Sequence, residues 1–245
     1  MNWPSREQIL ELRRALPLIA AALFVAALFF PMWIIEVHAV QYPDEILYLR
    51  LYAYPRIAGD YVEMARLNHY IGFYYPDPVY WTPNFDVNPD AIDVPEWSFG
   101  WIAFVVVSAL SIVVAVAPTT AKLKRGLKWQ LVGTVGVFTI MLADIQYRLY
   151  QAGHTLDPDA PVMGVSGFTP PLWGRYEVAN ITSYSYFGAG AFMAMLACLL
   201  LAVAYYVRGS PVTFGDLRTR ARRRVTGEEL SPSRRDEQSI EKGAK

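Results

Sequence analysis

The chain has 245 residues, of which 54% are apolar, 14% aromatic and 18% charged, and its formal net charge is zero. This balance is typical of a membrane protein and not of a water-soluble domain of the same length. The single cysteine, Cys198, excludes an intramolecular disulfide and a Cys-x-x-Cys metal site. The sequence contains no phosphate-binding loop, and we expect no nucleic-acid partner.

Four apolar stretches are long enough to cross the ~30 Å hydrocarbon core of a bilayer. We expect transmembrane helices at 15–35, 99–118, 127–147 and 186–207. The first stretch is too long and too apolar for a signal-peptide core and has no small-residue cleavage site, so we expect it to be retained. The predicted fold is therefore an α-helical membrane protein with four spans, and its first partner is the lipid bilayer.

Basic residues set the expected orientation. Of the 22 lysines and arginines, 17 lie before the first span, between the second and third spans, or after the fourth. Because such residues are enriched on the cytoplasmic side, we expect a cell inner (plasma) membrane protein with both termini in the cytoplasm. The cytoplasmic segments would be a lead-in whose arginines lie among the headgroups, a short turn and a disordered tail, at 1–14, 119–126 and 208–245.

The larger outer segment, 36–98, contains nine tyrosines, which argues for a structured domain. Residues 46–54 alternate as a β-strand does. Asp60 followed by Glu63 is a helix start signal, with a carboxylate placed to accept from free backbone N–H groups, and this helix should end near Gly72. Prolines between 76 and 95 predict an irregular return to the membrane. The second outer segment, 148–185, is rich in turns.

Two charged residues lie at the outer end of the third span. Asp144 and Arg148 are four residues apart, so they can pair on one helical face. A structural ion pair is the favoured interpretation, because a charge inside the bilayer is costly. A direct role in moving an ion or a small molecule is the alternative.

All three histidines, His38, His69 and His154, lie in the outer segments. This excludes a haem held by two transmembrane histidines, but it permits a metal site at the outer membrane surface. Imidazoles combined with the thioether of Met64 or Met163 would suit copper. The alternative is that the histidines are hydrogen-bonded residues near the membrane interface.

Several short motifs occur in a fixed order along the chain: QYP at 41–43, GD at 59–60, LNHYIG at 67–72, GHTLDP at 153–158 and PPLWG at 170–174. In these motifs, and in Asn180, the chain resembles an uncharacterised family of bacterial multi-pass membrane proteins. Members of that family often accompany accessory genes for nitrous oxide reductase maturation and copper delivery. The resemblance covers most of the chain up to the last span.

The resemblance selects five residues within these motifs: Asn68, His69, Tyr70, His154 and Asp157. It implies that the two histidines are metal ligands, together with Met64 from the reasoning above, and that the other three support them. His38 is not selected. Phe73 stands where the family usually has a methionine, which removes one soft ligand from a copper site.

Three functions follow as hypotheses. The first is a membrane accessory protein that handles copper, or helps to mature an exported metalloenzyme such as nitrous oxide reductase, at the outer face. The second is a scaffold or docking subunit without metal, which binds an exported or membrane protein through residues 36–98. The third is a conduit that uses Asp144 and Arg148. An enzyme is not indicated, because the sequence shows no nucleophile–base pair and no paired carboxylates at a recognisable spacing.

Overall fold

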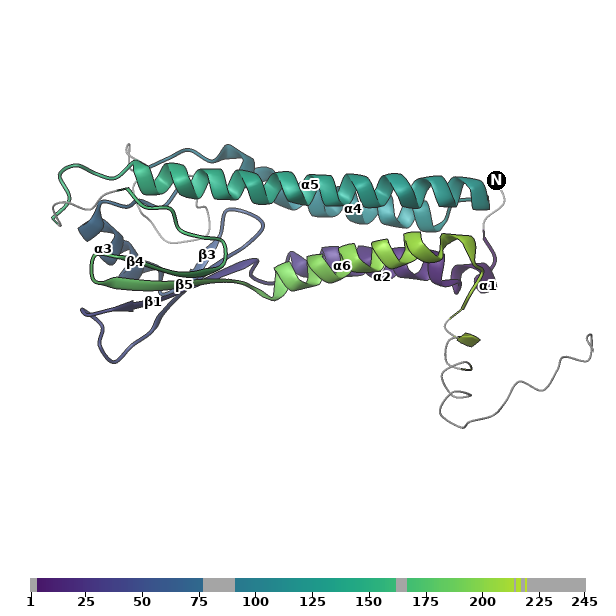
Figure 1. The fold of residues 1–245 in the computed structure, drawn as a ribbon, viewed down its shortest axis with the longest axis horizontal. Coiled ribbons are helices and arrows are strands. Elements are labelled where there is room, and N and C mark those ends of the chain that lie inside the picture. Colours follow the sequence, from purple (N-terminus) through teal and green to yellow (C-terminus); the bar gives the residue numbers. More distant parts are fainter. Residues whose placement is uncertain (1–3, 77–90, 162–166, 214, 217–218, 220–245) are drawn as a thin grey trace, which may run out of the picture.

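The computed structural model describes residues 4–76, 91–161, 167–213, 215–216 and 219. The molecule is elongated, with a helical bundle at one end and a small antiparallel sheet at the other (Figure 1). The described chain begins and ends at the bundle end, away from the sheet. Met163 and most of the tail expected to be disordered lie outside the described residues, as does most of the proline-rich part of 76–95.

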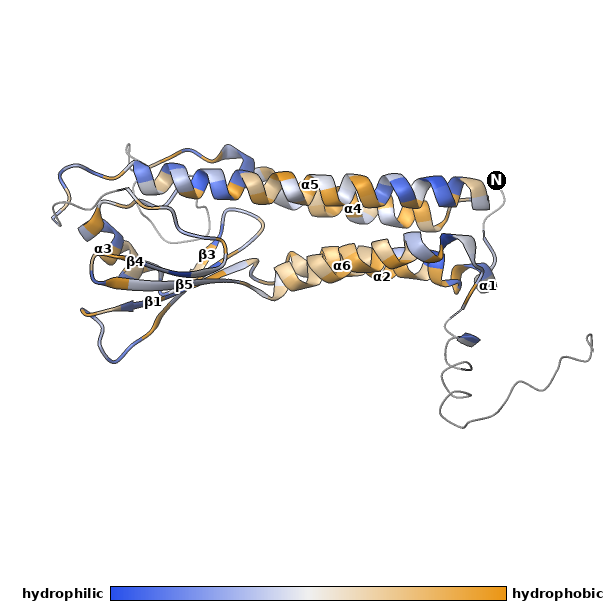
Figure 2. Ribbon diagram, in the orientation of Figure 1, coloured by the Kyte–Doolittle hydropathy of each residue, from blue (hydrophilic) through white to orange (hydrophobic). Residues whose placement is uncertain are grey.

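The bundle is built from four helices whose sequences are mostly apolar, although the longest of them also carries polar stretches (Figure 2). These are α2 (Leu12–Ala27), α4 (Gly100–Ala115), α5 (Thr120–His154) and α6 (Ala189–Tyr206). Shorter helical turns flank them: α1 (Arg6–Ile9), η1 (Pro95–Phe99) and η2 (Val207–Gly209). Helix α2 packs against both α6 and α4.

Among the described residues, three helical stretches are long and apolar enough to cross a membrane: Pro95–Ala115, Thr120–His154 and Ala189–Gly209. The chain is therefore compatible with a bilayer environment. The expected first span, in contrast, is divided. Its helix α2 has 16 residues, about 24 Å at 1.5 Å per residue, and the chain enters a strand at Trp33. Pro31 cannot continue a helix, and an uninterrupted apolar run does not show by itself where a helix gives way to a strand.

The other expected boundaries also move. The predicted turn at 119–126 is mostly helix, because α5 begins at Thr120, where the Thr119 hydroxyl accepts a hydrogen bond from the backbone N–H of Lys122 at 3.3 Å. This is the usual N-cap arrangement. At its other end α5 continues to His154, beyond the predicted 147. The fourth helix begins at Ala189, and Tyr186 belongs to a strand.

The sheet has five antiparallel strands in the order β3-β2-β1-β5-β4. Their bounds are β1 (Trp33–Ala39), β2 (Leu47–Leu51), β3 (Ile57–Gly59), β4 (Gly174–Val178) and β5 (Ile181–Phe187). The central strand β1 follows α2, and its partner β5 precedes α6, so the sheet begins where the bundle ends. Backbone N–H groups of Gly188 and Gly190 donate to the carbonyls of Met32 and Pro31 at 2.8 and 2.9 Å, which closes this junction.

Helix α3 (Tyr61–Ile71) covers one face of the sheet. Its Met64 and Leu67 pack into a core with Val37 of β1 and Leu49 of β2. The helix forms where the sequence predicts it, and Gly72 ends it in the left-handed conformation at φ 74°.

The predicted cap of α3 is wrong in detail. The Asp60 carboxylate makes no hydrogen bond to its own helix. It accepts one from the backbone N–H of Tyr48 at 2.8 Å, and the backbone N–H of Asp60 donates to the Tyr48 carbonyl at 2.9 Å. Asp60 therefore joins the start of α3 to strand β2.

Arg13 and Arg14 of the lead-in are buried, although we expected the arginines of this segment among the headgroups. Arg14 is only 4% exposed, and its guanidinium donates to the carbonyls of Ala115 and Ala117 at 2.7 and 2.9 Å. Arg13 pairs with Glu11 at 2.7 Å. The last carbonyls of a helix have no partner within that helix, so Arg14 serves as the C-terminal cap of α4.

Candidate functional site

Two of the sequence motifs meet in space. Gly72 ends LNHYIG, and its carbonyl accepts a hydrogen bond of 2.9 Å from the backbone N–H of Asp157 in GHTLDP. A Cβ on Gly72 would lie 2.8 Å from both the backbone N and O of Asp157. This close approach, together with the positive φ of Gly72, requires glycine at this position.

Asp157 is held by groups that sequence reasoning did not select. Its carboxylate accepts from the Tyr74 hydroxyl at 2.7 Å and from the backbone N–H of Asp159 at 2.8 Å. The Tyr74 hydrogen bond, followed by the Asp159 bond, lowers the pKa of Asp157, and the nearby charge of His69 contributes in the same direction. The structure thus brings His69 and Asp157 into the same region, and their expected roles at a metal site stay a prediction.

The other predicted metal residues have local structural roles. The Nδ1 atom of His154 lies 2.8 Å from the Tyr150 carbonyl, and its ring stacks on that tyrosine with centroids 4.1 Å apart. Met64 is 6% exposed inside the α3–sheet core. Asn68 is buried, whereas Tyr70 is 47% exposed. Within the described part of the chain, no three His, Cys, Asp or Glu side chains form a group that could hold a metal ion.

Another of the sequence motifs, PPLWG at 170–174, contacts both the long helix α5 and strand β1 of the sheet. The Gln146 side chain of α5 donates to the Pro170 carbonyl at 3.3 Å, and the Trp33 indole of β1 donates to the Leu172 carbonyl at 3.0 Å. Sequence analysis did not identify Trp33 and Gln146 as partners of this motif, because both lie far from it along the chain. The motif therefore connects the long helix α5 to the sheet through these two hydrogen bonds.

The predicted pair of Asp144 and Arg148 exists, but it is the longer of two contacts. Their charged atoms are 4.0 Å apart, whereas the Arg148 guanidinium lies 2.5 Å from the Glu96 carboxylate on η1. Arg148 also donates to the Gln151 side chain at 2.9 Å. The arginine therefore joins α5 to the start of α4, which agrees with the structural interpretation of the pair.

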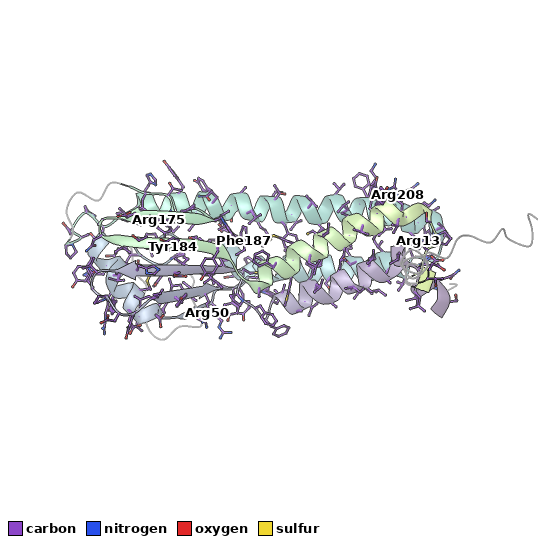
Figure 3. All side chains as sticks on the ribbon, turned by 60° about the horizontal axis from the view of Figure 1, so that its bottom comes forward. Arg13, Arg50, Arg175, Tyr184, Phe187 and Arg208 are labelled. Atoms are coloured by element: carbon purple, nitrogen blue, oxygen red, sulfur yellow. The ribbon has the colours of Figure 1, made fainter. Side chains whose placement is uncertain are left out.

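The sheet face opposite α3 carries a different set of side chains, which we call the open face. Successive side chains of a strand point to opposite faces, so the residues alternating with the core positions belong here. Figure 3 shows Arg50, Arg175 and Tyr184 at the sheet end of the molecule, with Phe187 at the junction to the bundle. The open face consists of Ile34, Glu36, His38, Tyr48, Arg50, Ala58, Arg175, Glu177, Thr182, Tyr184 and Tyr186.

Glu36 organises the middle of the open face. Its carboxylate oxygens lie 2.8 Å from Nε2 of His38 and 3.3 Å from the hydroxyl of Tyr186, which donates to it. The His38 ring meets the Tyr184 ring edge-on, with centroids 5.6 Å apart. Partial burial, followed by the neighbouring Glu36 charge, raises the pKa of Tyr186. His38, which the resemblance does not select, is thus a central residue of this face.

A hollow of about 530 Å³ lies at the end of β1 and β5 that is farther from the bundle. Two open-face residues, His38 and Thr182, line it, so it continues that face. The β1–β2 connection supplies most of the remaining wall, including Tyr42 and Pro43 of the QYP motif, and Asn180 supplies part of the opposite side. Asp44 and Glu45 add two carboxylates. The hollow could take a basic or an aromatic side chain.

Comparisons with protein-family models, with curated proteins and with solved structures find no match to this chain. The site must therefore be interpreted from its own geometry.

Proposed function

We propose that this protein is a membrane-embedded docking subunit whose open sheet face binds an exported or membrane protein. One observation carries the proposal: α3 covers one face of the sheet, while the opposite face presents tyrosines and charged side chains at the surface. Tyr184 is 38% exposed, and the side chains of Arg175 and Glu177 are each 58% exposed.

The composition of the open face suits a protein interface. Tyrosine gives a large contact area with a polar end, and arginine and tyrosine are enriched among the residues that dominate binding energy. The exposed charges have both signs, so a partner with a complementary mixed surface would be selected over one with a single sign of charge. The hollow beside His38 would receive one anchoring side chain of that partner.

The orientation of this surface is set by the bundle. Strand β1 follows α2 in the chain, and strand β5 precedes α6. Beyond the end of α2, the backbone N–H groups of residues 28–30 donate hydrogen bonds to carbonyls three residues earlier, so the turns continue to Phe30. We propose that all four helices lie in the membrane, with the sheet on the outer side and both termini in the cytoplasm, because described basic residues such as Arg13, Lys122 and Arg208 lie at the bundle end. A surface fixed in this way loses little conformational freedom when it binds.

The proposal is tested with a photocrosslinking amino acid placed in the full-length membrane protein. Position 184 on the open face should form an adduct of defined mass in cells, whereas position 70 on α3 should not, since Tyr70 is a similarly exposed tyrosine on another surface. The double change Arg50→Glu with Tyr184→Ala should remove an adduct formed from position 186. The matched change Arg66→Glu with Tyr70→Ala should leave it unaltered. Equal adducts from positions 184 and 70 would contradict the proposal.

Copper handling is a second candidate, favoured by the contact that brings His69 near Asp157. It predicts copper in protein that has been equilibrated with the metal and dialysed, reduced in His69→Ala with His154→Ala but retained in His38→Ala. Retention of copper by the double variant would eliminate this site. The measurement is independent of the crosslinking experiment.

A further inference from the structure

We propose that the first two turns of α5 form a binding surface for anionic phospholipid headgroups. Four basic residues lie within seven positions there: Lys122, Lys124, Arg125 and Lys128. All four are exposed. We call this set the cationic arc of α5. It lies at the opposite end of the molecule from the open face and does not depend on the docking function.

The arc takes up the outward side of the helix. At 100° per residue, Leu123, Leu127 and Gln130 share one side of α5, and these three are buried in the bundle. The four basic residues lie on the rest of the circumference. In the described part of the chain, none of the four has a carboxylate within the 4.0 Å of an ion pair. Their charge is therefore available to an external anion.

The nearest part of the sequence does not neutralise this charge. No aspartate or glutamate occurs between Gly100 and Ala143. Of the acidic residues that are described at this end of the molecule, Glu11 is already paired with Arg13 at 2.7 Å, and Asp216 accepts from Thr213 at 2.9 Å. The surface is thus complementary to a layer of negative headgroups.

Along the exposed side of α5, the residue types follow the same order as the layers of a bilayer: basic residues, then an aromatic ring, then apolar side chains. The cationic arc is followed by Trp129, which is 64% exposed, with the Lys128 ammonium 5.7 Å from its ring centroid. Exposed apolar residues come next, including Val132 at 54% and Ile140 at 70%. Tyr147, 56% exposed, lies 18 residues after Trp129, or about 27 Å. Aromatic residues with this separation match the two interfaces of a ~30 Å hydrocarbon layer.

This geometry places the arc among the headgroups and the Trp129 ring just below them. Basic residues near an anionic leaflet are attracted to it, and the attraction weakens as salt increases. Phosphate oxygens of phosphatidylglycerol or of a related anionic lipid would be the binding groups. Zwitterionic lipids would compete poorly.

The test is native mass spectrometry of the full-length protein in mild detergent with equal amounts of phosphatidylglycerol and phosphatidylcholine. Wild type should retain phosphatidylglycerol in excess. The triple change K122Q/R125Q/K128Q should lower the ratio of the two retained lipids at least fivefold, and R50Q/R66Q/R175Q, which removes the same charge at the sheet end, should leave it unchanged. The charge-retaining change K122R/K128R should also preserve the ratio.

Melting temperatures and elution volumes equal to those of wild type identify variants that are correctly folded. Equal retention of the two lipids by wild type would overturn the proposal, as would an unchanged ratio in K122Q/R125Q/K128Q. If that variant does not fold, K122Q/K128Q replaces it, with an expected decrease of at least threefold. An equal decrease in R50Q/R66Q/R175Q would show only a general effect of net charge and would also overturn the assignment.

Discussion

Replacing Arg14 by methionine should destabilise the bundle, because Arg14 caps the C-terminal end of α4. Two hydrogen bonds from a charged donor, at 2.7 and 2.9 Å to the carbonyls of Ala115 and Ala117, would be lost. Such bonds contribute about 1.5–3 kcal/mol each. Against this loss, the Nε atom of Arg14 is buried without a partner, which costs the native protein about 1–3 kcal/mol. Subtracting this cost from the sum for the two bonds gives a net decrease in the free energy of unfolding of up to about 5 kcal/mol, with a middle value of about 2.5 kcal/mol.

The measurement is reversible unfolding of the protein in mixed micelles, compared with wild type and with Arg66→Met. Arg66 is exposed on α3, so its replacement should change the unfolding free energy by no more than about 0.5 kcal/mol. Arg14→Lys, which keeps a positive donor, should recover part of the lost stability. A loss below 0.5 kcal/mol in Arg14→Met, or an equal loss in both methionine variants, would refute the capping role.

Three further predictions concern the outer domain. Gly72→Ala should lower its melting temperature, because a Cβ would meet the Asp157 backbone at 2.8 Å in a positive-φ position; the control is Val62→Ala on the same helix. Leu67→Ala should cost about 2–5 kcal/mol in unfolding experiments, because it empties a core position that is 2% exposed. Tyr74→Phe should raise the pKa of Asp157 toward its usual value in a carboxyl NMR titration, because it removes the main cause of the lowered pKa. A carboxyl group whose pKa is lowered by folding stabilises the fold at pH values above its unfolded-state pKa, and this contribution is lost as pH falls through its folded-state pKa. Tyr74→Phe should therefore reduce the loss of stability in acid. An unchanged acid transition would contradict this prediction.

Local signals account for what could be predicted from sequence. Gly72 ends α3 as predicted because a left-handed C-terminal residue acts within one turn of the helix, whereas Asp60 stands at the start of α3 but its carboxylate bonds to strand β2. The alternation at 46–54 indicates β2 for a similar reason. The apolar stretches identified helices but not their ends, because Tyr186 and Phe187, where the expected fourth span begins, are the last residues of strand β5.

What could not be predicted depends on contacts between distant residues. Glu96 reaches Arg148 across 52 positions, and Trp33 reaches Leu172 across 139. The open face exists only through the pairing of β1 with β5, so neither periodicity nor a motif could place His38 beside Tyr184. The hydrogen bond from Tyr74 that holds Asp157 joins residues 83 positions apart, so no local pattern indicates it.

The pairing of β1 with β5 also means that the sheet cannot be completed until late in the synthesis of the chain. Strand β1 is synthesised early, but its central partner ends at Phe187, after α5 has been completed. At about 5–20 residues per second, a ribosome needs roughly 10–30 s to pass from one strand to the other. During that interval the sheet end of the molecule has α3 and two short strands but an open edge along β1. An unpaired strand edge is a site for incorrect association, so newly made chains of this protein should need protection of that edge until β5 has been made.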